Sequence, residues 1–151
     1  MAHTYTHLLV HVVLCTKERR PLLDEELKER LVPYLAGIAE RLGAQLLAAN
    51  GPADHIHLLM LFRPAVALAD LVRSMKGSSS KWIHDTWPSS RATFAWQQGY
   101  AAFTVSQSAR ERVEKYIGAQ QEHHRRASFQ QELRSLLERH GVPFDERYLL
   151  G

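Results

Sequence analysis

Residues 54–60 read Asp54-His55-Ile56-His57-Leu58-Leu59-Met60 and open an apolar run that follows a turn signal. Such a run predicts a β-strand over residues 55–62. Side chains alternate between the two faces of a strand, so His55 and His57 should project together while Ile56 points into the core. One face of this strand is therefore apolar, and the other carries two imidazoles.

Three further segments have the alternation and the β-branched content of strands. They are residues 4–16, 44–49 and 100–105. The first gives the strongest signal, because Val10, Val12 and Leu14 share one face while His11 and Val13 share the other. Together with the strand that carries the histidine pair, these segments predict four strands.

Helical periodicity and capping residues predict four helices. Asp24 can cap the first, which ends at Gly43. The second starts near Leu68, and the glycine and serine run after Met75 either interrupts it or extends it. Capping boxes open the last two helices, at Ser108 with Glu111 and at Ser128 with Gln131.

The order of elements is strand, helix, strand, strand, helix, strand and then two helices. The first six spell the split β-α-β repeat of ferredoxin-like and RRM-like folds. We expect an α+β fold with a single antiparallel sheet, helices on one face and additional C-terminal helices. The other face is left for a ligand, a partner subunit or the last helices. We expect one domain over residues 1–151, with residues 126–151 as a C-terminal helical extension.

The composition is that of a soluble globular protein. The 151 residues are 45% hydrophobic and 23% charged, and the formal net charge of +3 permits a nucleic-acid partner without requiring one. The single cysteine, Cys15, excludes an intrachain disulfide and a zinc site built on cysteines. The chain shows no signal-peptide pattern and no apolar run long enough to cross a bilayer, so we expect a cytoplasmic protein without a membrane partner.

The histidine pair is a candidate metal site. Two imidazoles on one strand face, two residues apart, can bind the same divalent ion. The alternative is that His55 and His57 are polar residues on a solvated sheet face. Their place at the start of a strongly apolar strand, directly after a turn, favours the metal site.

A second candidate motif is Tyr116-Ile117-Gly118-Ala119-Gln120. Positions four apart lie on one face of a helix, so Tyr116 and Gln120 should stand one turn apart. The amide oxygen of Gln120 can bind a hard cation, and the phenol of Tyr116 can attack a phosphorus centre when a metal or base assists its deprotonation. The alternative is that Tyr116 belongs to an apolar stripe with Val113 and Ile117.

Five other histidines are expected not to bind this metal. His3, His7 and His11 share one face of the first strand, but a spacing of four residues is too long for two ligands of one ion, so we expect them to be exposed or at an interface. His123 and His124 are adjacent in a helix and point about 100° apart. With the two arginines that follow, they should contact phosphates or solvent.

Lysine and arginine residues occur in several clusters, which are either solvated helix faces or contacts to a nucleic acid. Six of them are candidate DNA contacts: Arg19, Arg20, Lys76, Lys81, Arg125 and Arg126.

Taken in order, the histidine pair and the tyrosine motif resemble the HUH single-tyrosine transposases. This family comprises small bacterial insertion-sequence transposases and their domesticated relatives, the REP-associated tyrosine transposases. The resemblance covers most of the chain, through Leu14-Cys15-Thr16-Lys17 with Arg19-Arg20-Pro21, Asp54-His55-Ile56-His57-Leu58-Leu59, Met75-Lys76-Gly77-Ser78-Ser79-Ser80-Lys81, Trp96-Gln97-Gln98-Gly99-Tyr100, Tyr116-Ile117 with Gln120, and Glu122-His123-His124-Arg125 with Ser128-Phe129. Ala53, where many relatives carry proline, and Gly118, inside the predicted tyrosine helix, depart from the pattern.

The resemblance implies a transposase that nicks and joins single-stranded hairpin DNA as a homodimer. His55, His57 and Gln120 would hold Mg²⁺ or Mn²⁺, with no small-molecule cofactor. Tyr116 would attack the scissile phosphate and form a 5′-phosphotyrosine with a free 3′-hydroxyl. In this family the tyrosine helix can complete the site of the partner subunit, so these residues need not converge within one chain. Ligand softness alone favours Mn²⁺ over Mg²⁺ for two imidazoles and is also compatible with Zn²⁺.

Other functions fit parts of the pattern. A non-catalytic RRM-like module would bind nucleic acid through aromatic residues on its exposed sheet face, but here the histidines occupy that face. A metal-dependent hydrolase that uses bound water would not need the tyrosine. A domesticated REP-associated enzyme would share the chemistry of a mobile-element transposase and differ in its biological role.

Overall fold

The computed structural model describes residues 3–90, 93–124 and 127–149. The strands are β1 (Leu8–Cys15), β2 (Ala44–Asn50), β3 (His55–Phe62) and β4 (Ala101–Thr104). The helices are α1 (Glu25–Arg41), α2 (Leu68–Thr86), α3 (Arg110–Gly118), α4 (Gln120–His123) and α5 (Phe129–Arg139). Short 3-10 turns η1 to η4 cover Lys17–Arg19, Pro88–Ser90, Gln107–Ala109 and Glu146–Tyr148.

The strands form one antiparallel sheet in the order β2-β3-β1-β4. β3 is therefore an inner strand that pairs with both β1 and β2. In the β1–β3 register, His55 lies opposite Cys15 and His57 lies opposite Val13. Both histidines thus lie at the end of the sheet where β1 leaves it. The predicted α+β fold with a single antiparallel sheet is confirmed.

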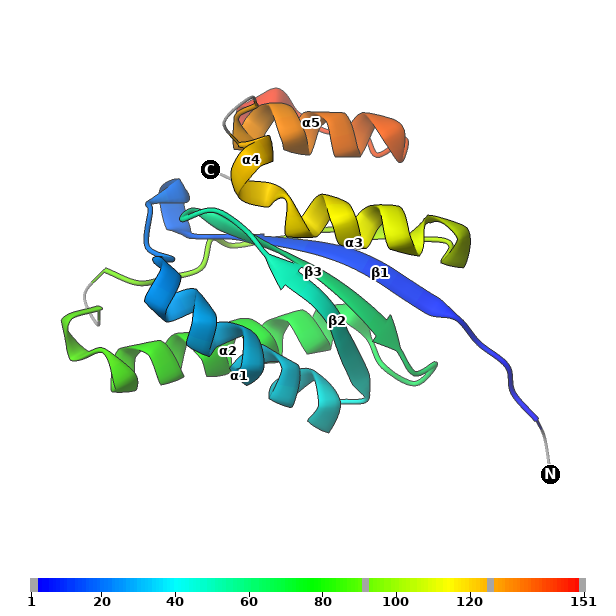
Figure 1. The fold of residues 1–151 in the computed structure, drawn as a ribbon, viewed down its shortest axis with the longest axis horizontal. Helices are drawn as coiled ribbons and strands as arrows, with labels where there is room; N and C mark the ends of the chain where they lie inside the picture. Colours follow the sequence, from blue (N-terminus) through cyan, green and yellow to red (C-terminus); the bar gives the residue numbers. More distant parts are fainter. Residues whose placement is uncertain (1–2, 91–92, 125–126, 150–151) are drawn as a thin grey trace.

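One face of the sheet is an apolar core covered by α1 and α2 (Figure 1). Every second residue of β3 points into this core, and Ile56, Leu58 and Met60 are fully buried there. The predicted cap of α1 is confirmed, because the Asp24 side chain accepts a hydrogen bond from the backbone N–H of Leu27. Removal of these apolar side chains from water stabilises this layer.

Helices α3, α4 and α5 lie on the opposite face of the sheet (Figure 1). The apolar side chains of α5, which include Phe129, Leu133 and Leu137, form a second buried cluster with Phe103 of β4. The predicted capping box at the start of α5 is present, with Ser128 bonded to Gln131 in both directions. Of the three possible occupants of this face, the last helices cover it.

Two strand and helix boundaries differ from the prediction. β1 begins at Leu8 rather than at residue 4, because its partner β3 ends at Phe62, opposite Leu8. Ser108 does not cap α3: its hydroxyl pairs with that of Ser106, and η3 precedes the helix.

α2 continues without a break through Gly77 and the serines that follow it, so this run extends the helix. α2 is 19 residues long. In the described part of the chain, no helix combines the length and the apolar character needed to cross a membrane.

Candidate active site

His55 and His57 lie on the face of β3 that the C-terminal helices cover, and both side chains are completely buried. Their ring centroids are 5.1 Å apart. The alternative of two polar residues on a solvated face is therefore wrong. Buried polar groups require hydrogen-bond partners, and each ring has a partner at both nitrogens.

Each of the two rings has a side-chain partner at its Nδ1 atom. Nδ1 of His55 lies 2.7 Å from Oδ1 of Asp54, and Nδ1 of His57 lies 2.8 Å from Nε2 of His11. The expectation that His11 is exposed or at an interface is wrong: β1 is an inner strand, and His11 is buried beside His57. Because Nδ1 of each ring has a protein partner, both rings direct Nε2 toward α5. Histidines that bind metals are held in this way, with one ring nitrogen on a protein group and the other on the metal.

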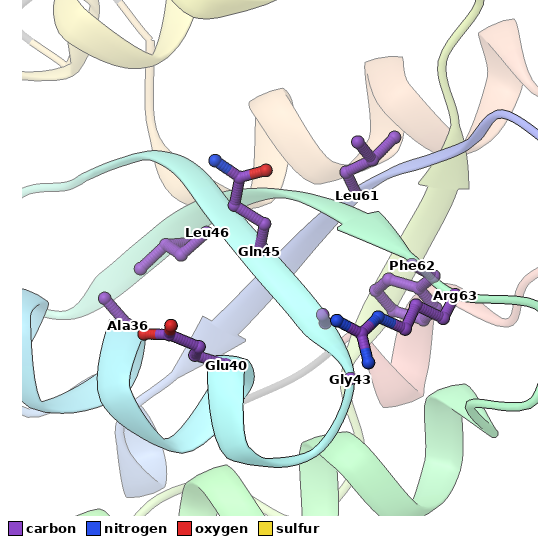
Figure 2. A pocket seen from close by; sticks show the side chains of 9 residues that line it. Ala36, Glu40, Gly43, Gln45, Leu46, Leu61, Phe62 and Arg63 are labelled. Carbon is purple, nitrogen blue, oxygen red and sulfur yellow. The ribbon is translucent and has the colours of Figure 1, made fainter.

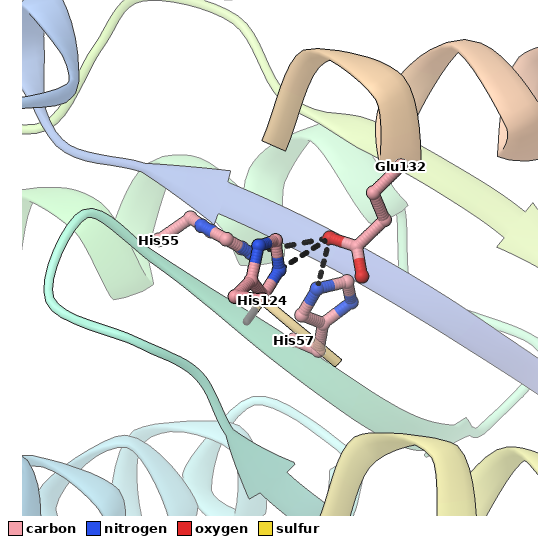
Figure 3. Close-up of side chains that lie close together, drawn as sticks. All are labelled: His55, His57, His124 and Glu132. Atoms are coloured by element: carbon pink, nitrogen blue, oxygen red, sulfur yellow. Dashed lines mark hydrogen bonds and ion pairs between the residues drawn. The ribbon is translucent and has the colours of Figure 1, made fainter. Parts of the chain in front are cut away.

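Glu132 of α5 faces both of these Nε2 atoms (Figure 3). Its Oε1 lies 3.2 Å from Nε2 of His55 and 3.0 Å from Nε2 of His57. Glu132 is not part of the site motifs predicted from the sequence. The available signal was its place in the apolar stripe of α5, one turn after Phe129 and one turn before Leu136.

His124, directly after α4, supplies a third imidazole. Its Nε2 lies 3.2 Å from Oε1 of Glu132, and its ring centroid lies 4.5 Å from that of His55. Phosphates or solvent were the expected contacts of His124, but the chain changes direction at Ala119 and places this ring beside β3, with its side chain 12% exposed. One ligand atom from each of His55, His57, His124 and Glu132 lies within 4.8 Å of the others.

Tyr116 reaches the same cluster from α3. Its hydroxyl donates to Oε2 of Glu132, and its ring centroid lies 5.7 Å from that of His57. The predicted continuous helix is interrupted, since α3 ends at Gly118 and α4 starts at Gln120. Gln120 is nevertheless buried, and its Nε2 lies 3.4 Å from the carbonyl oxygen of Tyr116. A single chain brings these residues together.

Burial and hydrogen bonding shift the pKa values of the cluster in different directions. Burial opposes ionisation of Glu132, but hydrogen bonds from three imidazoles outweigh it and hold the pKa of this carboxyl well below its usual range. Burial, reinforced by Glu132, raises the pKa of the Tyr116 phenol well above its usual range. The site therefore combines an ionised carboxylate with a phenol that keeps its proton near neutral pH.

The imidazoles also differ from one another. Burial would lower the pKa of His55, but hydrogen bonds to Asp54 and Glu132 outweigh it and raise the pKa. Burial lowers the pKa of His57, and burial together with the adjacent His57 lowers the pKa of His11 to about 3. Neutral His11 can therefore accept the Nδ1 proton of His57. Imidazole nitrogens with a carboxylate suit a divalent ion such as Mn²⁺.

Residues 4–120 match the model of a protein family described as "Transposase IS200 like". This segment is most of the chain and includes the histidine pair, Tyr116 and Gln120. The chain belongs to this family. As a transposase, it is a DNA-cleaving enzyme.

Curated relatives agree with this assignment. The ISDra2 transposase TnpA of Deinococcus radiodurans is 30% identical over 114 residues, which are 73% of this chain and 81% of the relative. The transposase for insertion sequence element IS200 of Salmonella typhimurium is 26% identical over 126 residues, which are 81% of this chain and 82% of the relative.

Solved structures share the fold of this transposase. A crystal structure of a Deinococcus radiodurans protein assigned as a transposase has a TM-score of 0.66 and 27% identity, and covers 80% of this chain and 95% of its own. The REP associated tyrosine transposase, bound to a REP hairpin, has a TM-score of 0.61 and 12% identity, and covers 82% of this chain and 74% of its own. The second likeness is one of fold alone.

The predicted basic contacts of this transposase do not all lie near the cluster. Arg19 and Arg20 follow β1, and Arg20 forms an exposed ion pair with Glu18 at 2.9 Å. Arg125 and Arg126 lie outside the described residues.

The two lysines that were predicted to contact DNA lie on α2, which covers the opposite face of the sheet (Figure 1). Lys76 donates to the backbone carbonyl of Gln97 at 2.7 Å, so its ammonium holds the segment before β4. Lys81 pairs with Asp85 at 2.7 Å on the exposed side of the helix. The structure thus separates these lysines from the histidine cluster.

A pocket of about 470 Å³ lies at the other end of the sheet (Figure 2). The end of α1, the start of β2 and the end of β3 line it, with polar side chains from Glu40, Gln45 and Arg63. His55 begins β3, whereas this pocket lies where β3 ends at Phe62. The pocket is therefore separate from the candidate site.

Proposed function

We propose that this transposase cuts and rejoins single-stranded hairpin DNA through a 5′-phosphotyrosine on Tyr116, with Mg²⁺ or Mn²⁺ held by His55, His57 and Gln120. The observation that carries the proposal is convergence within one chain: the Tyr116 hydroxyl and two histidine Nε2 atoms meet at the same carboxylate. The structural neighbour bound to a REP hairpin supports hairpin DNA as the substrate.

In the proposed reaction, the phenol oxygen of Tyr116 attacks the scissile phosphorus. A bond forms between this oxygen and phosphorus, the bond from phosphorus to the 3′-oxygen breaks, and the 3′-oxygen takes up a proton from water to leave as a 3′-hydroxyl. The phosphotyrosine conserves the energy of the broken bond. A 3′-hydroxyl that later attacks the phosphotyrosine rejoins the DNA and restores the phenol.

The proton of Tyr116 has to leave during the attack. The hydroxyl already donates to Oε2 of Glu132, which makes this carboxylate the nearest proton acceptor. Burial and the charge of Glu132 raise the pKa of Tyr116 and oppose its ionisation. A divalent ion held by His55, His57 and Gln120 would supply positive charge that polarises the phosphate and favours the phenolate. We therefore expect cleavage to require the metal.

We propose that Arg19 and Arg20 contact the DNA backbone beside the site. They follow the end of β1, where the backbone N–H of Thr16 donates to the carbonyl of Asp54 at 2.9 Å. Asp54 in turn contacts His55. The other four basic candidates stay predictions.

We also propose that the enzyme is a cytoplasmic homodimer, as the resemblance implies. The edge strands β2 and β4 are compatible with pairing between subunits. We propose one domain over residues 1–151, with residues 126–151 as a C-terminal helical extension; packing of α5 against β1 and β4 supports a single domain.

A cleavage assay on labelled single-stranded hairpins from the DNA that flanks the gene tests the proposal. Wild-type protein should form a denaturant-resistant protein–DNA adduct only with Mg²⁺ or Mn²⁺, and Tyr116→Phe should form none. Tyr5→Phe is the matched control, because Tyr5 is 90% exposed, and it should behave as wild type.

Two results would contradict the proposal. Metal-dependent cutting that survives Tyr116→Phe would indicate a hydrolase that uses bound water. Binding without cutting, across a panel of flanking hairpins, would indicate a binding module.

A further inference from the structure

We infer that His124 and Glu132 are also ligands of the metal ion, so that the ion fastens α5 to the sheet. This inference rests on the proposed metal site and adds two ligands to it. Both residues lie beyond residues 4–120, the segment that matches the transposase family. The C-terminal part of the chain would thus supply two metal ligands in addition to those in the matched segment.

The distances among the donors are those of neighbours in one coordination shell. Oε1 of Glu132 lies 3.0 Å from Nε2 of His57 and 3.2 Å from Nε2 of both His55 and His124, and the four ligand atoms all lie within 4.8 Å of one another. In a six-coordinate shell with bonds of roughly 2.1–2.2 Å, adjacent donors are about 3.0 Å apart and opposite donors about 4.3 Å apart. Small side-chain shifts place all four around one ion.

Two of the contacts bring acceptor atoms together unless a proton or a metal cation lies between them. When His55 is neutral and Asp54 accepts its Nδ1 proton at 2.7 Å, Nε2 of the ring carries no proton. Its lone pair then faces Oε1 of Glu132 at 3.2 Å. The same holds for His57 when its Nδ1 donates to His11. A metal ion between these atoms turns the repulsion into coordination.

Glu132 lies on the buried, apolar side of α5, where a leucine would be the expected residue. Its neighbours on the buried side of α5 include Phe129, Leu133 and Leu136, and Glu132 itself is 4% exposed. A buried carboxylate is unfavourable unless its charge is compensated. The three imidazoles contact this carboxylate through hydrogen bonds, and a divalent ion would add the positive charge that balances it.

Gln120 remains in the ligand set. Its Oε1 lies 3.1 Å from Nε2 of His124, within the 3.0–3.2 Å between the other neighbouring donors. With these five protein donors, a six-coordinate ion would have one position left for a phosphate oxygen of DNA. Three imidazoles in the set favour Mn²⁺ over Mg²⁺.

Mn²⁺ binding in the absence of DNA tests the two added ligands. Electron paramagnetic resonance of the unbound aquo ion gives the dissociation constant for wild type and for each variant. We expect Glu132→Gln and His124→Ala each to weaken Mn²⁺ binding by at least about tenfold. Glu138→Gln is the matched control: Glu138 lies on α5 but is exposed, and its variant should bind as wild type.

Hydrogen exchange tests whether the ion fastens α5. Mn²⁺ should slow exchange of the α5 amides in wild type and in Glu138→Gln, and should leave it unchanged in Glu132→Gln. Circular dichroism in EDTA shows whether each variant is folded before metal is added. If Glu132→Gln does not fold, His124→Ala decides the outcome, because the His124 side chain is partly exposed at the end of a short helix.

Wild-type Mn²⁺ affinity in the folded variants would overturn the inference. Its failure is separable from that of the proposed function, since the binding measurement uses no DNA. A metal-dependent Tyr116 adduct with Mn²⁺ affinity independent of Glu132 would leave the proposed function standing and remove the added ligands. Mn²⁺ binding that depends on Glu132, without any DNA adduct, would support the added ligands and contradict the proposed function.

Discussion

The two faces of the sheet share their strands and their degree of burial but differ in chemistry. Toward α1 and α2, β3 presents Ile56, Leu58 and Met60, which contact other apolar side chains. Toward α3, α4 and α5, it presents His55 and His57, which are equally buried but hydrogen-bonded. The degree of burial therefore does not distinguish a structural face from a functional one. The contacts of the buried side chains distinguish them: apolar contacts on one face and hydrogen bonds on the other.

This difference decides what each face tolerates. An apolar core accepts exchanges between side chains of similar volume at small cost. A buried polar cluster does not, because removal of one partner leaves other polar atoms without a hydrogen bond. We therefore expect substitutions on the two faces to affect different properties.

The largest effect is expected from His57→Ala. This variant removes a proposed ligand and a partner of both Glu132 and His11. Adduct formation with hairpin DNA should fall by at least about a hundredfold in the gel assay. His7→Ala, on an exposed residue before β1, is the control and should retain wild-type adduct formation. Equal activity in the two variants would mean that the polar face has no catalytic role.

Leu58→Ala, the neighbouring position on the apolar face, should affect stability alone. Leu58 is fully buried, so its truncation should lower the free energy of unfolding by about 2–5 kcal/mol. Urea unfolding in EDTA measures this loss, and Mn²⁺ titration of the folded variant should give the wild-type dissociation constant. A marked loss of Mn²⁺ affinity would show that the two faces are not independent.

Acid should destabilise the protein through the polar face. The pKa of His11 is lowered from 6.5 to about 3, so below pH 6.5 the unfolded chain takes up a proton that the folded protein does not. Stability is lost as pH falls, at up to about 1.4 kcal/mol per pH unit from this one group.

His11→Gln should reduce this slope between pH 6.5 and 4.5, measured by urea unfolding in EDTA. The usual pKa of the Glu132 carboxyl, 4.5, lies at the lower end of this window, so that group adds to the slope only near pH 4.5 and does so in both proteins. His7→Gln should leave the slope unchanged. An unaltered slope in His11→Gln would contradict the assignment of a neutral buried ring.

The smallest effects are expected at the helix caps. Asp24→Ala and Ser128→Ala each remove a side-chain cap and should lower the free energy of unfolding by about 1 kcal/mol in urea. The caps belong to helices on opposite faces. Only Ser128→Ala should also weaken Mn²⁺ binding, because α5 carries Glu132. An equal effect of both variants on Mn²⁺ would contradict the link between α5 and the metal.

Local patterns were sufficient to predict the sheet and half of the candidate site. Alternation along β3 placed His55 and His57 on one face, and the order of strands and helices gave the ferredoxin-like arrangement. These features depend on neighbouring residues in the sequence. They are therefore visible without knowledge of distant contacts.

The remaining half depends on how the C-terminal helices fold back over the sheet. The position of His124 follows from the break in the helix at Ala119, for which the only local signal is the preceding Gly118, a poor helix former. The burial of Glu132 follows from the packing of α5, and that of His11 from its place on an inner strand. Each of these depends on long-range contacts.

The most direct measurement is mass spectrometry of the protein–DNA adduct after nuclease trimming and tryptic digestion. Trypsin cleaves after Lys115 and Arg125, so Tyr116 lies in the peptide of residues 116–125, which contains no other tyrosine. We predict a nucleotide phosphate on this peptide, formed only with metal. Attachment to another peptide, such as one that carries Tyr5 or Tyr148, or cleaved DNA without attachment, would contradict Tyr116 as the nucleophile.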